Sequence, residues 1–439
     1  MTRPDTPSHP APVAPRLGLG GSVALAAAAA LFWWLRISYW GVTEEEPFSD
    51  MADYHHIAEG FAACGSLTED DFWQSDRPPL LPILGAVKIL LFGVDLAPWR
   101  WLQACLLFSS ACWLVLELRR AFGSWRVPIA FLWVVALARS SVFWSYKFAT
   151  EGLHEAMLYL VLAAALRLVR APSVPWASLV GALAMTATFN RANFAVALVA
   201  IPLLLWFAAP VPATPLRLGR ARALWAPGLA FVLGALLIWT PWGIRTYRLY
   251  GRPLPTTTSG AAIALDGIAR IDVREPDGTT LTITYDEFTA GARHRFATDA
   301  DAEAWLGERF RRWILADPSR WLGDVYRRLC RSAFDHAISL SKVPRDRLLP
   351  DWRDALLLDK RRALTVLGLL GLAVAGWRRR ALALLFALTV LPWLLGCCFL
   401  GLPRLFEPGL PLVLFGNLLL AATIVDFVRA RRRSVPSGA

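Results

Sequence analysis

The sequence has 439 residues, of which 56% are hydrophobic and only 18% are charged, and it contains 21 tryptophans. This composition is too apolar for a soluble domain of that length, and it indicates a polytopic membrane protein. The net charge of +12 could suggest a nucleic-acid partner, but much of the arginine lies in short clusters at the ends of apolar stretches. That pattern is typical of membrane topology, so we expect no nucleic acid.

A helix needs about 20 apolar residues to cross the hydrocarbon core of a bilayer. We expect ten such spans, at residues 17–39, 98–118, 127–146, 152–169, 174–189, 192–209, 224–242, 363–377, 381–400 and 408–428. The first is interpreted as a retained anchor and not as a signal peptide, because it ends in the bulky run WWLRISYW and lacks a small-residue cleavage site. The Pro/Ala-rich tail before it, residues 1–16, is expected to be disordered and cytoplasmic.

The arginine clusters predict the orientation of the chain, since such clusters favour the cytoplasmic side. They lie at residues 118–120, 166–170, 217–222, 377–380 and 429–433. The basic tail 429–439 is then inside, and the segments that face the other side are 40–97, 147–151, 190–192, 243–362 and 401–407. Lys360, Arg361 and Arg362 violate this rule.

Residues 80–93, LLPILGAVKILLFG, are apolar but short. Counting them as a full crossing would put the arginine clusters after residue 118 on the wrong side, so we interpret them as an interfacial or re-entrant helix. A crossing here stays an alternative, and the expected bundle therefore has about 10–11 transmembrane helices.

The outer side carries two large segments, a first loop at 40–97 and a longer segment at 243–362. The longer one contains IARIDVREPDGTTLTITY, in which two alternating runs flank a Pro-Asp-Gly turn and predict a β-hairpin. From 300 to 334, apolar residues recur at helical spacing with a break at Asp317-Pro318, which predicts two amphipathic helices. These helices could lie in the outer interface or pack against the top of the bundle.

The expected fold class is thus an all-α polytopic membrane protein with a small mixed α/β extracytoplasmic segment. An N-terminal membrane module at 17–242 would be followed by the outer segment 243–362 and by C-terminal membrane helices at 363–428. Of six cysteines, only Cys64 and Cys330 fall outside the spans. Both would face an oxidising compartment, which permits a disulfide between them.

Polar residues near the outer ends of spans are candidates for function, since charges in hydrocarbon are costly. The first group stands on SDMADYHHIAEGF, which could form one helix with Ser49 as its N-cap. On such a helix Asp50 and Tyr54 share a face, as do Asp53 and His56. The alternative is a solvated loop helix with a capping aspartate.

Four further places share the outer side. Arg77, in SDRPPLLP, suits either a lipid headgroup or a bound phosphate. Glu151 opens a span together with His154, and Lys147 stands just before it; the helix dipole alone would favour an acid there. The last two places are short connections between spans: Arg191 lies in FNRANF, and Arg404 with Glu407 lies in GLPRLFEP.

Arginines in such connections can be snorkelling residues or members of local ion pairs. Taken together, however, a base-capable acid, several phosphate-capable arginines and a proline-hinged loop on one side of the bundle indicate acid/base chemistry. A lipid-linked phosphate would be the substrate of such a site.

The order of these motifs resembles that of the GT-C glycosyltransferases. The most similar branch contains the dolichyl-phosphate-mannose protein mannosyltransferases and the bacterial aminoarabinose–lipid A transferases, formerly grouped as glycosyltransferase family 39. The resemblance covers roughly residues 17–428. It is carried by SDMADYHHIAEGFAACG, RPPLLPILGAV, FATEGLHEAMLYL, FNRANF, TPWGIRTYRLYGRPLPTTTSG and PRLFEPGLPLVL.

The resemblance implies a GT-C type bundle in the cell (inner) membrane, with its active site facing the periplasm or exterior. The implied reaction is an inverting transfer of a sugar from a polyprenyl-phosphate donor to a hydroxyl acceptor on a lipid, glycan or protein. Asp50 would be the general base and Glu151 a second acid of the site. Many relatives carry two adjacent acids in the first loop, whereas Asp50 and Asp53 are three apart, so either could be the base; Asp50 keeps the spacing to Tyr54.

The residues expected to bind the substrate are Tyr54, His55, Arg77, Arg191, Arg245 and Arg404, the arginines by stabilising the departing lipid phosphate. No strong set of metal ligands is visible, although His55 and His56 could coordinate a divalent ion. A transporter or flippase of lipid-linked sugars is the main alternative. It would place charges near the bilayer midplane and show inverted repeats. A non-catalytic subunit of an envelope complex is a second alternative.

Overall fold

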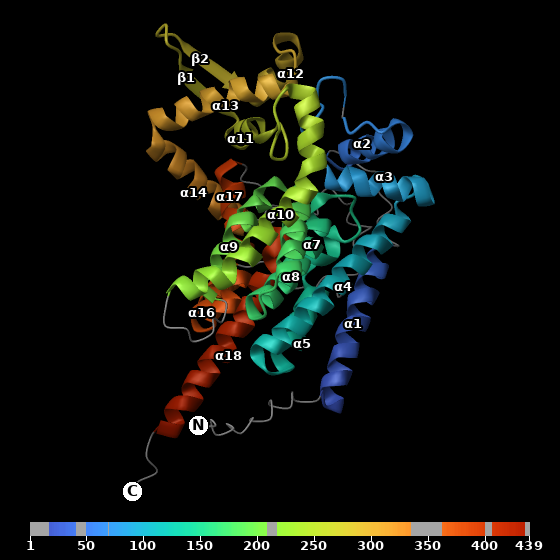
Figure 1. The fold of residues 1–439 in the computed structure, drawn as a ribbon, viewed down its shortest axis with the longest axis vertical. Helices are drawn as coiled ribbons and strands as arrows, with labels where there is room; N and C mark the ends of the chain where they lie inside the picture. The colour runs from blue at the N-terminus through green and yellow to red at the C-terminus, as the bar shows by residue number, and fades with distance from the viewer. Residues whose placement is uncertain are drawn as a thin grey trace, which may run out of the picture.

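The computed structural model describes residues 17–40, 50–68, 70–208, 217–334, 362–399 and 406–434. These residues form a tall helical bundle with a small domain at one end, opposite the start of α1 and the end of α18 (Figure 1). The bundle elements are α1 (Leu19–Trp40), α4 (Ala97–Phe122), α5 (Arg126–Leu137), α6 (Arg139–Trp144), α7 (Thr150–Arg170), α8 (Val174–Asn190), η1 (Ala192–Val196), α9 (Ala197–Ala208), α10 (Arg217–Tyr250), α16 (Arg362–Arg378), η4 (Arg380–Leu382), α17 (Ala383–Phe399), η6 (Glu407–Gly409) and α18 (Leu410–Ser434).

The chain is a multi-pass membrane protein. Within the described ranges, six helices are long and apolar enough to cross a membrane: Leu19–Trp40, Ala97–Phe122, Thr150–Arg170, Leu224–Tyr250, Arg380–Cys398 and Glu407–Arg429. The other four expected spans also fall on helices, which are shorter. Helix α7 forms the centre of the bundle, since almost all of its residues are buried against neighbouring helices.

Small residues allow close helix packing where lipid supplies no hydrophobic drive between helices. A Cβ atom at Gly181 of α8 would lie 1.9 Å from the carbonyl oxygen of Phe231 in α10. A Cβ atom at Gly234 of α10 would lie 1.9 Å from the carbonyl oxygen of Ser178. Glycine at both positions therefore lets α8 and α10 touch backbone to backbone.

The expected span at 127–146 is not one continuous helix, because the chain breaks at Ala138 into α5 and α6. Ala138 has an extended backbone (φ −65°, ψ 119°) that ends the helix. The fully buried Arg36 of α1 stabilises the break: its guanidinium donates to the carbonyl of Val135 at 3.4 Å and to the Ser141 hydroxyl at 2.7 Å. These contacts satisfy polar groups that a continuous helix would not leave open.

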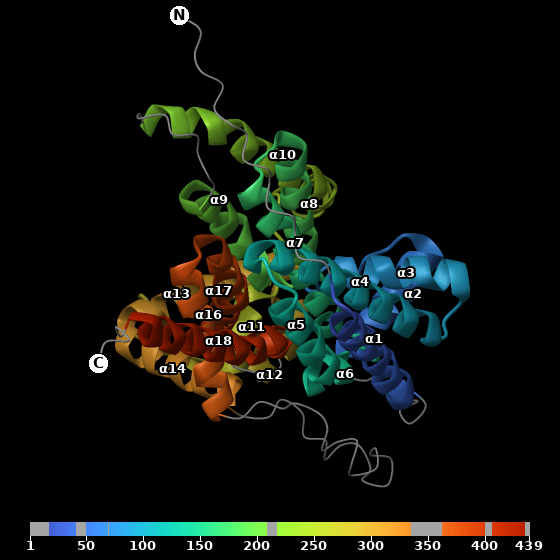
Figure 2. The ribbon, with the colours of Figure 1, turned by 90° about the horizontal axis from the view of Figure 1, so that it is seen from below.

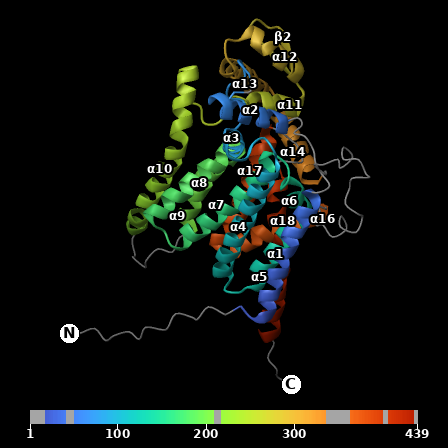
Figure 3. The same ribbon diagram turned by 90° about the vertical axis from the view of Figure 1, so that its right-hand side faces the viewer.

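The short helices α2 (Asp50–Cys64) and α3 (Leu80–Phe92) pack against each other and run across the long axis, near the start of α4 (Figures 1 and 3). With 13 residues, α3 is too short to span a bilayer. Its end exposes Leu90, Leu91 and Phe92. This orientation supports the interpretation of residues 80–93 as an interfacial helix.

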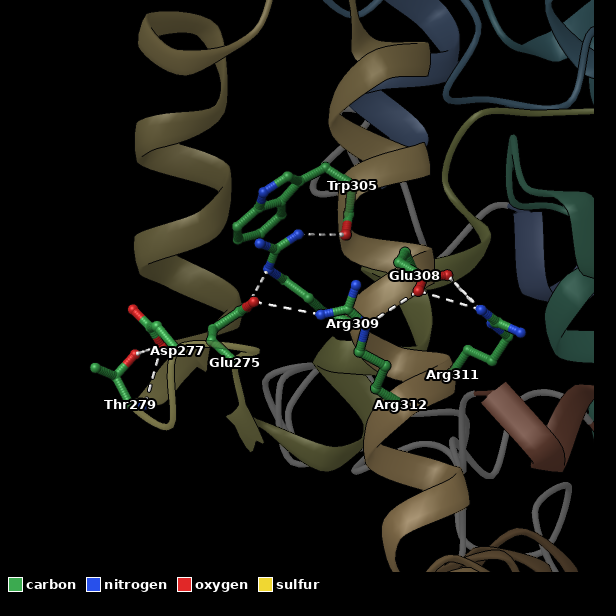
Figure 4. Close-up of polar contacts among 8 residues, drawn as sticks. All are labelled: Glu275, Asp277, Thr279, Trp305, Glu308, Arg309, Arg311 and Arg312. Atoms are coloured by element: carbon green, nitrogen blue, oxygen red, sulfur yellow. Dashed lines mark hydrogen bonds and ion pairs between the residues drawn. The ribbon is translucent and has the colours of Figure 1, made fainter.

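The small domain contains α11 (Gly260–Ile268), β1 (Arg270–Arg274), β2 (Thr280–Thr284), α12 (Tyr285–Arg295), α13 (Asp299–Ala316) and α14 (Pro318–Phe334). The predicted hairpin is confirmed: β1 and β2 are antiparallel, and Arg270 pairs with Thr284. At the turn, Glu275 binds Arg309 at 2.9 Å and Arg312 at 3.3 Å, which fixes the hairpin to α13 (Figure 4). Gly278 supplies the positive φ of 85° that the turn needs.

The two helices predicted between 300 and 334, with their break at Asp317-Pro318, are also confirmed as α13 and α14. Helix α13 buries Phe310 and Trp313 in the core of the small domain. Helix α14 descends to the bundle, where the Trp393 indole of α17 donates to the Ser332 hydroxyl at 2.6 Å. Helix α14 therefore packs against the bundle, as one of the two alternatives had it, whereas α13 packs within the small domain.

The disulfide between Cys64 and Cys330 is not formed, since both are free thiols. Cys64 ends α2, and Cys330 lies on α14 on the opposite side of the molecule (Figures 1 and 2). A bridge needs Cα atoms within about 7 Å, so the shared compartment was not a sufficient reason to pair them.

Three of the arginine clusters, at 118–120, 166–170 and 377–380, meet at the end of the bundle away from the small domain. The fully buried Glu117 of α4 forms ion pairs with Arg120 and with Arg170 at the end of α7. Arg379 donates to the carbonyl of Ala121, so the cluster at 377–380 joins the same end. The chain therefore separates a basic end from the end that carries α2, α3 and the small domain.

Candidate active site

Helix α2 presents two acids to one arginine. The Nη2 atom of Arg77 lies 2.5 Å from Oδ2 of Asp53, and its Nη1 atom lies 3.5 Å from Oδ1 of Asp50. Ser49, the expected N-cap, lies outside the described residues, but the helix begins at Asp50 as expected. Asp53 thus holds the guanidinium tightly, whereas Asp50 is held more loosely.

Asp76 is a third acid at this arginine. Its Oδ2 atom lies 3.4 Å from Nε of Arg77, on the edge of the guanidinium that Asp50 and Asp53 do not use. Asp76 stands directly before Arg77 in SDRPPLLP, but no sequence pattern marks it as a site residue. The site therefore places three carboxylates around one cation.

Tyr54, on the same helix as Asp50 and Asp53, lies beside Arg77. Its ring lies 5.7 Å from the Arg77 guanidinium, and its side chain is buried. Burial raises the pKa of Tyr54 above its usual value; the charges of Arg77 and Arg191 oppose this shift, and those of Asp50 and Glu151 add to it. The phenol stays protonated at neutral pH and can donate a hydrogen bond.

Glu151 and Arg191 form a buried ion pair between the start of α7 and the end of α8, with Nη2 and Oε1 3.2 Å apart. The two side chains are 3% and 9% exposed. The Asn190 amide donates to the carbonyl of Thr150 at 2.9 Å and joins the same two helix ends. The structure thus arranges four of the expected site residues as two ion pairs, Asp50 with Arg77 and Glu151 with Arg191, whose charges both act on the pKa of Tyr54.

The histidines have other surroundings. His55 lies 3.4 Å from Glu59 and makes an edge contact with the Phe148 ring, and burial lowers its pKa. His154 is buried and contacts the Phe194 ring. Among the described residues, no three His, Cys, Asp or Glu side chains gather in an arrangement suited to a metal ion. The first-loop acids Asp50 and Asp53 face Arg77.

Arg245 lies next to the site but binds the first loop. Its guanidinium donates to the Ser75 hydroxyl at 2.8 Å and to the carbonyls of Gln74 and Leu67 at 2.8 and 2.9 Å. These contacts indicate a structural task for this arginine. Its expected contact with a phosphate stays a prediction.

The connection between α6 and α7 adds a buried cation. Lys147 packs over the rings of Phe143 and Tyr146, and burial lowers its pKa to about 8. The Trp144 indole donates to Glu407 of η6, which ties α6 to the start of α18. Arg404 lies outside the described residues, so its expected role stays a prediction.

No family model matches the sequence, and no curated protein matches it. Among solved structures, the chain is similar to the oligosaccharyltransferase of Archaeoglobus fulgidus in its apo form, with a TM-score of 0.52, 12% identity, and coverage of 95% of this chain and 52% of that one. The same archaeal protein, tethered to an acceptor peptide with the NVT sequon, gives a TM-score of 0.51 and 12% identity, over 94% of this chain and 50% of that one.

ArnT of Cupriavidus metallidurans, bound to undecaprenyl phosphate, aligns with a TM-score of 0.40 and 15% identity, over 92% of this chain and 77% of that one. That score is too low to support an argument. The likeness to the archaeal structures shows the fold: the described helices are arranged as in the aligned part of that transferase, in agreement with the type of bundle that the motifs implied. The present chain spans about half the length of the archaeal chain.

Proposed function

We propose that this chain is an integral-membrane glycosyltransferase that moves a sugar from a polyprenyl-phosphate donor to a hydroxyl acceptor. The observation that carries the proposal is the convergence of α2, α7 and α8 at one end of the bundle. There Asp50 pairs with Arg77 and Glu151 pairs with Arg191, and both pairs lie near enough to the buried Tyr54 for their charges to act on its pKa. The archaeal oligosaccharyltransferase with the same fold adds support for this class of reaction.

In the proposed reaction the acceptor oxygen attacks the anomeric carbon of the sugar while the bond from that carbon to the phosphate oxygen breaks. Asp50 accepts the acceptor's proton as the new bond forms, because a hydroxyl is a weak nucleophile until its proton is taken. The electron pair of the broken bond leaves with the lipid phosphate. Attack from the side opposite the phosphate inverts the anomeric centre.

Asp50 is a better candidate for the base than Asp53. Asp53 holds Arg77 at 2.5 Å, whereas the contact of Asp50 is 3.5 Å long. A carboxylate held by the shorter charge-assisted hydrogen bond is more firmly oriented toward its partner and less available to a second one. Asp53 is then the residue that positions Arg77, and Asp50 is the one that takes the proton.

Arg77 and Arg191 already form ion pairs with carboxylates in this structure. Arg77 faces three carboxylates and Arg191 faces Glu151. A donor phosphate would therefore replace acids in the contacts of Arg77 before the guanidinium could stabilise the leaving group. This exchange loosens Arg77 from Asp50 and couples donor binding to release of the base.

The position of the acids distinguishes the proposed enzyme from a transporter. A transporter would hold its polar groups at the midplane between repeated halves, whereas the acids of this chain lie at the start of α7 and on α2, beside the small domain. The test is a transfer assay in which membranes containing the chain receive labelled polyprenyl-phosphate sugars. Labelled product on an acceptor supports the enzyme, and labelled donor that crosses the bilayer without product supports the transporter.

The arginine clusters at the opposite end predict that residues 243–362 face the periplasm or exterior of the cell membrane. A single cysteine placed at Thr280, on the exposed edge strand β2, should react with a membrane-impermeant thiol reagent added outside intact cells. A cysteine at Ser434, the last residue of α18, is the control and should react only after the membrane is opened. The reverse pattern would put the site on the cytoplasmic side and contradict the proposal.

A further inference from the structure

We propose that Asp299 of the small domain is a positioning residue for the active site, holding the segment 74–76 so that Arg77 stays opposite Asp50. This inference rests on the proposed function for its catalytic consequence. Its geometric basis is independent of that function, because it consists of contacts between the first loop and the small domain.

Asp299 is fully buried at the start of α13. Its Oδ2 atom accepts hydrogen bonds from the backbone N–H of Gln74 at 3.1 Å, from that of Ser75 at 3.0 Å and from the Thr258 hydroxyl at 2.8 Å. A buried carboxylate is stable only when such donors replace water, and these charge-assisted bonds are stronger than neutral ones. One side chain thus joins α13, the linker before α11 and the first loop.

The opposite edge of the same segment is held by the bundle. Arg245 of α10 donates to the Ser75 hydroxyl and to the Gln74 carbonyl, both at 2.8 Å. Asp299 therefore accepts hydrogen bonds from the backbone N–H groups of Gln74 and Ser75, while Arg245 donates to the Gln74 carbonyl and the Ser75 hydroxyl. The next residue is also tied, since the Ser259 hydroxyl donates to the carbonyl of Asp76 at 2.6 Å.

We call these contacts of Asp299, Arg245 and Ser259 with residues 74–76 the clamp. Arg77 follows directly after residue 76, and its side chain reaches α2. The clamp consequently decides how far the guanidinium can move toward Asp50, whose contact is 3.5 Å long. If the segment were loose, Arg77 could close on Asp50 and occupy the base. Small displacements of this kind are costly, since an error of about 1 Å in a catalytic group can lower a rate by roughly 100-fold.

The test compares Asp299→Asn with Asp301→Asn in the full-length chain. Both changes remove one negative charge from the first turn of α13. Asp301, however, is exposed, and its hydrogen bonds with Thr298 belong to the N-terminal cap of the helix. An asparagine at 299 would turn an amide group toward N–H donors. We expect hydrogen exchange at the amides of Gln74 and Ser75 to accelerate by about tenfold or more in Asp299→Asn, and to be unchanged in Asp301→Asn.

Sugar transfer should fall by about 10- to 100-fold in Asp299→Asn and stay normal in Asp301→Asn. A second variant, Ser75→Ala, keeps the N–H bonded to Asp299 and removes only the hydroxyl that Arg245 binds, so it tests the clamp with little risk to folding. We expect a smaller loss of transfer and a smaller acceleration of exchange than in Asp299→Asn.

A structural role alone would lower transfer by the same factor in any background. Acting through Arg77, however, Asp299→Asn should have little further effect in an Arg77→Gln chain, which a double-mutant cycle measures. Unchanged exchange at residues 74 and 75, or an equal loss in both backgrounds, would overturn the inference. If the unaltered chain transfers no sugar while exchange behaves as expected, the proposed function fails and the clamp stands.

Discussion

Replacing Asp50 with asparagine is expected to lower the rate of sugar transfer by roughly two to four orders of magnitude, which is the usual contribution of a positioned general base. Asparagine keeps the size of the side chain and can still accept a hydrogen bond, but it cannot take the acceptor's proton. The measurement is the initial rate of transfer from a labelled polyprenyl-phosphate sugar, with expression and thermal stability followed in parallel. Both should change little, since Asp50 is partly exposed at the first turn of α2.

Asp53→Asn is the matched control for this experiment. It removes the carboxylate that holds Arg77 at 2.5 Å but leaves the proposed base in place. We expect a milder loss that appears mainly as weaker donor binding. Near-normal turnover in Asp50→Asn together with loss of turnover in Asp53→Asn would make Asp53 the base. Full activity in both variants would remove the first loop from the chemistry.

The clamp around residues 74 and 75 gives the small domain a part in catalysis. The first loop also inserts Phe72 and Trp73 against the core of that domain, and Asp70 pairs with Arg293 at 2.5 Å. The loop that carries Arg77 is therefore anchored to an element outside the bundle, while the acids it faces belong to α2. A glycosyltransferase that works at a membrane surface needs such a rigid frame, because both substrates approach from outside the helices.

Local patterns predicted much of this architecture. The hairpin followed from alternation around a Pro-Asp-Gly turn, and the break before Pro318 followed from the loss of a backbone donor. Helix α2 begins where its acids suggested. The motifs also predicted which loops would meet, because spans that end on the same side of a membrane bring their connections together.

The same local patterns could not predict contacts between residues that are distant in the sequence. The stretch 127–146 was interpreted as one span although the polar run Arg139-Ser140-Ser141 directly follows Ala138. Only the fold shows that Arg36, on another helix, donates to groups on both sides of the break. Asp299 reads as an ordinary acid in the first turn of a helix, and only the fold shows that it binds residues 74 and 75. Arg245 was expected to bind phosphate, and only the fold shows that it also binds Ser75, Gln74 and Leu67 of the first loop.

The buried pair of Glu151 and Arg191 should show the second large effect. Arg191→Gln removes the cation that faces Glu151 at 3.2 Å, and losing one partner of a buried ion pair typically destabilises a protein by about 3–5 kcal/mol. We expect this variant to unfold at a clearly lower temperature in detergent and to lose sugar transfer almost completely.

The double variant Glu151→Gln with Arg191→Gln separates stability from chemistry. It replaces the ion pair by two neutral amides of similar size, so the buried charge disappears and most of the lost stability should return. Transfer should stay low, since the site then lacks both its second acid and a cation beside Tyr54. Recovery of transfer along with stability would show that the pair serves only to join α7 to α8, and the catalytic group would shrink to the acids and arginine of the first loop.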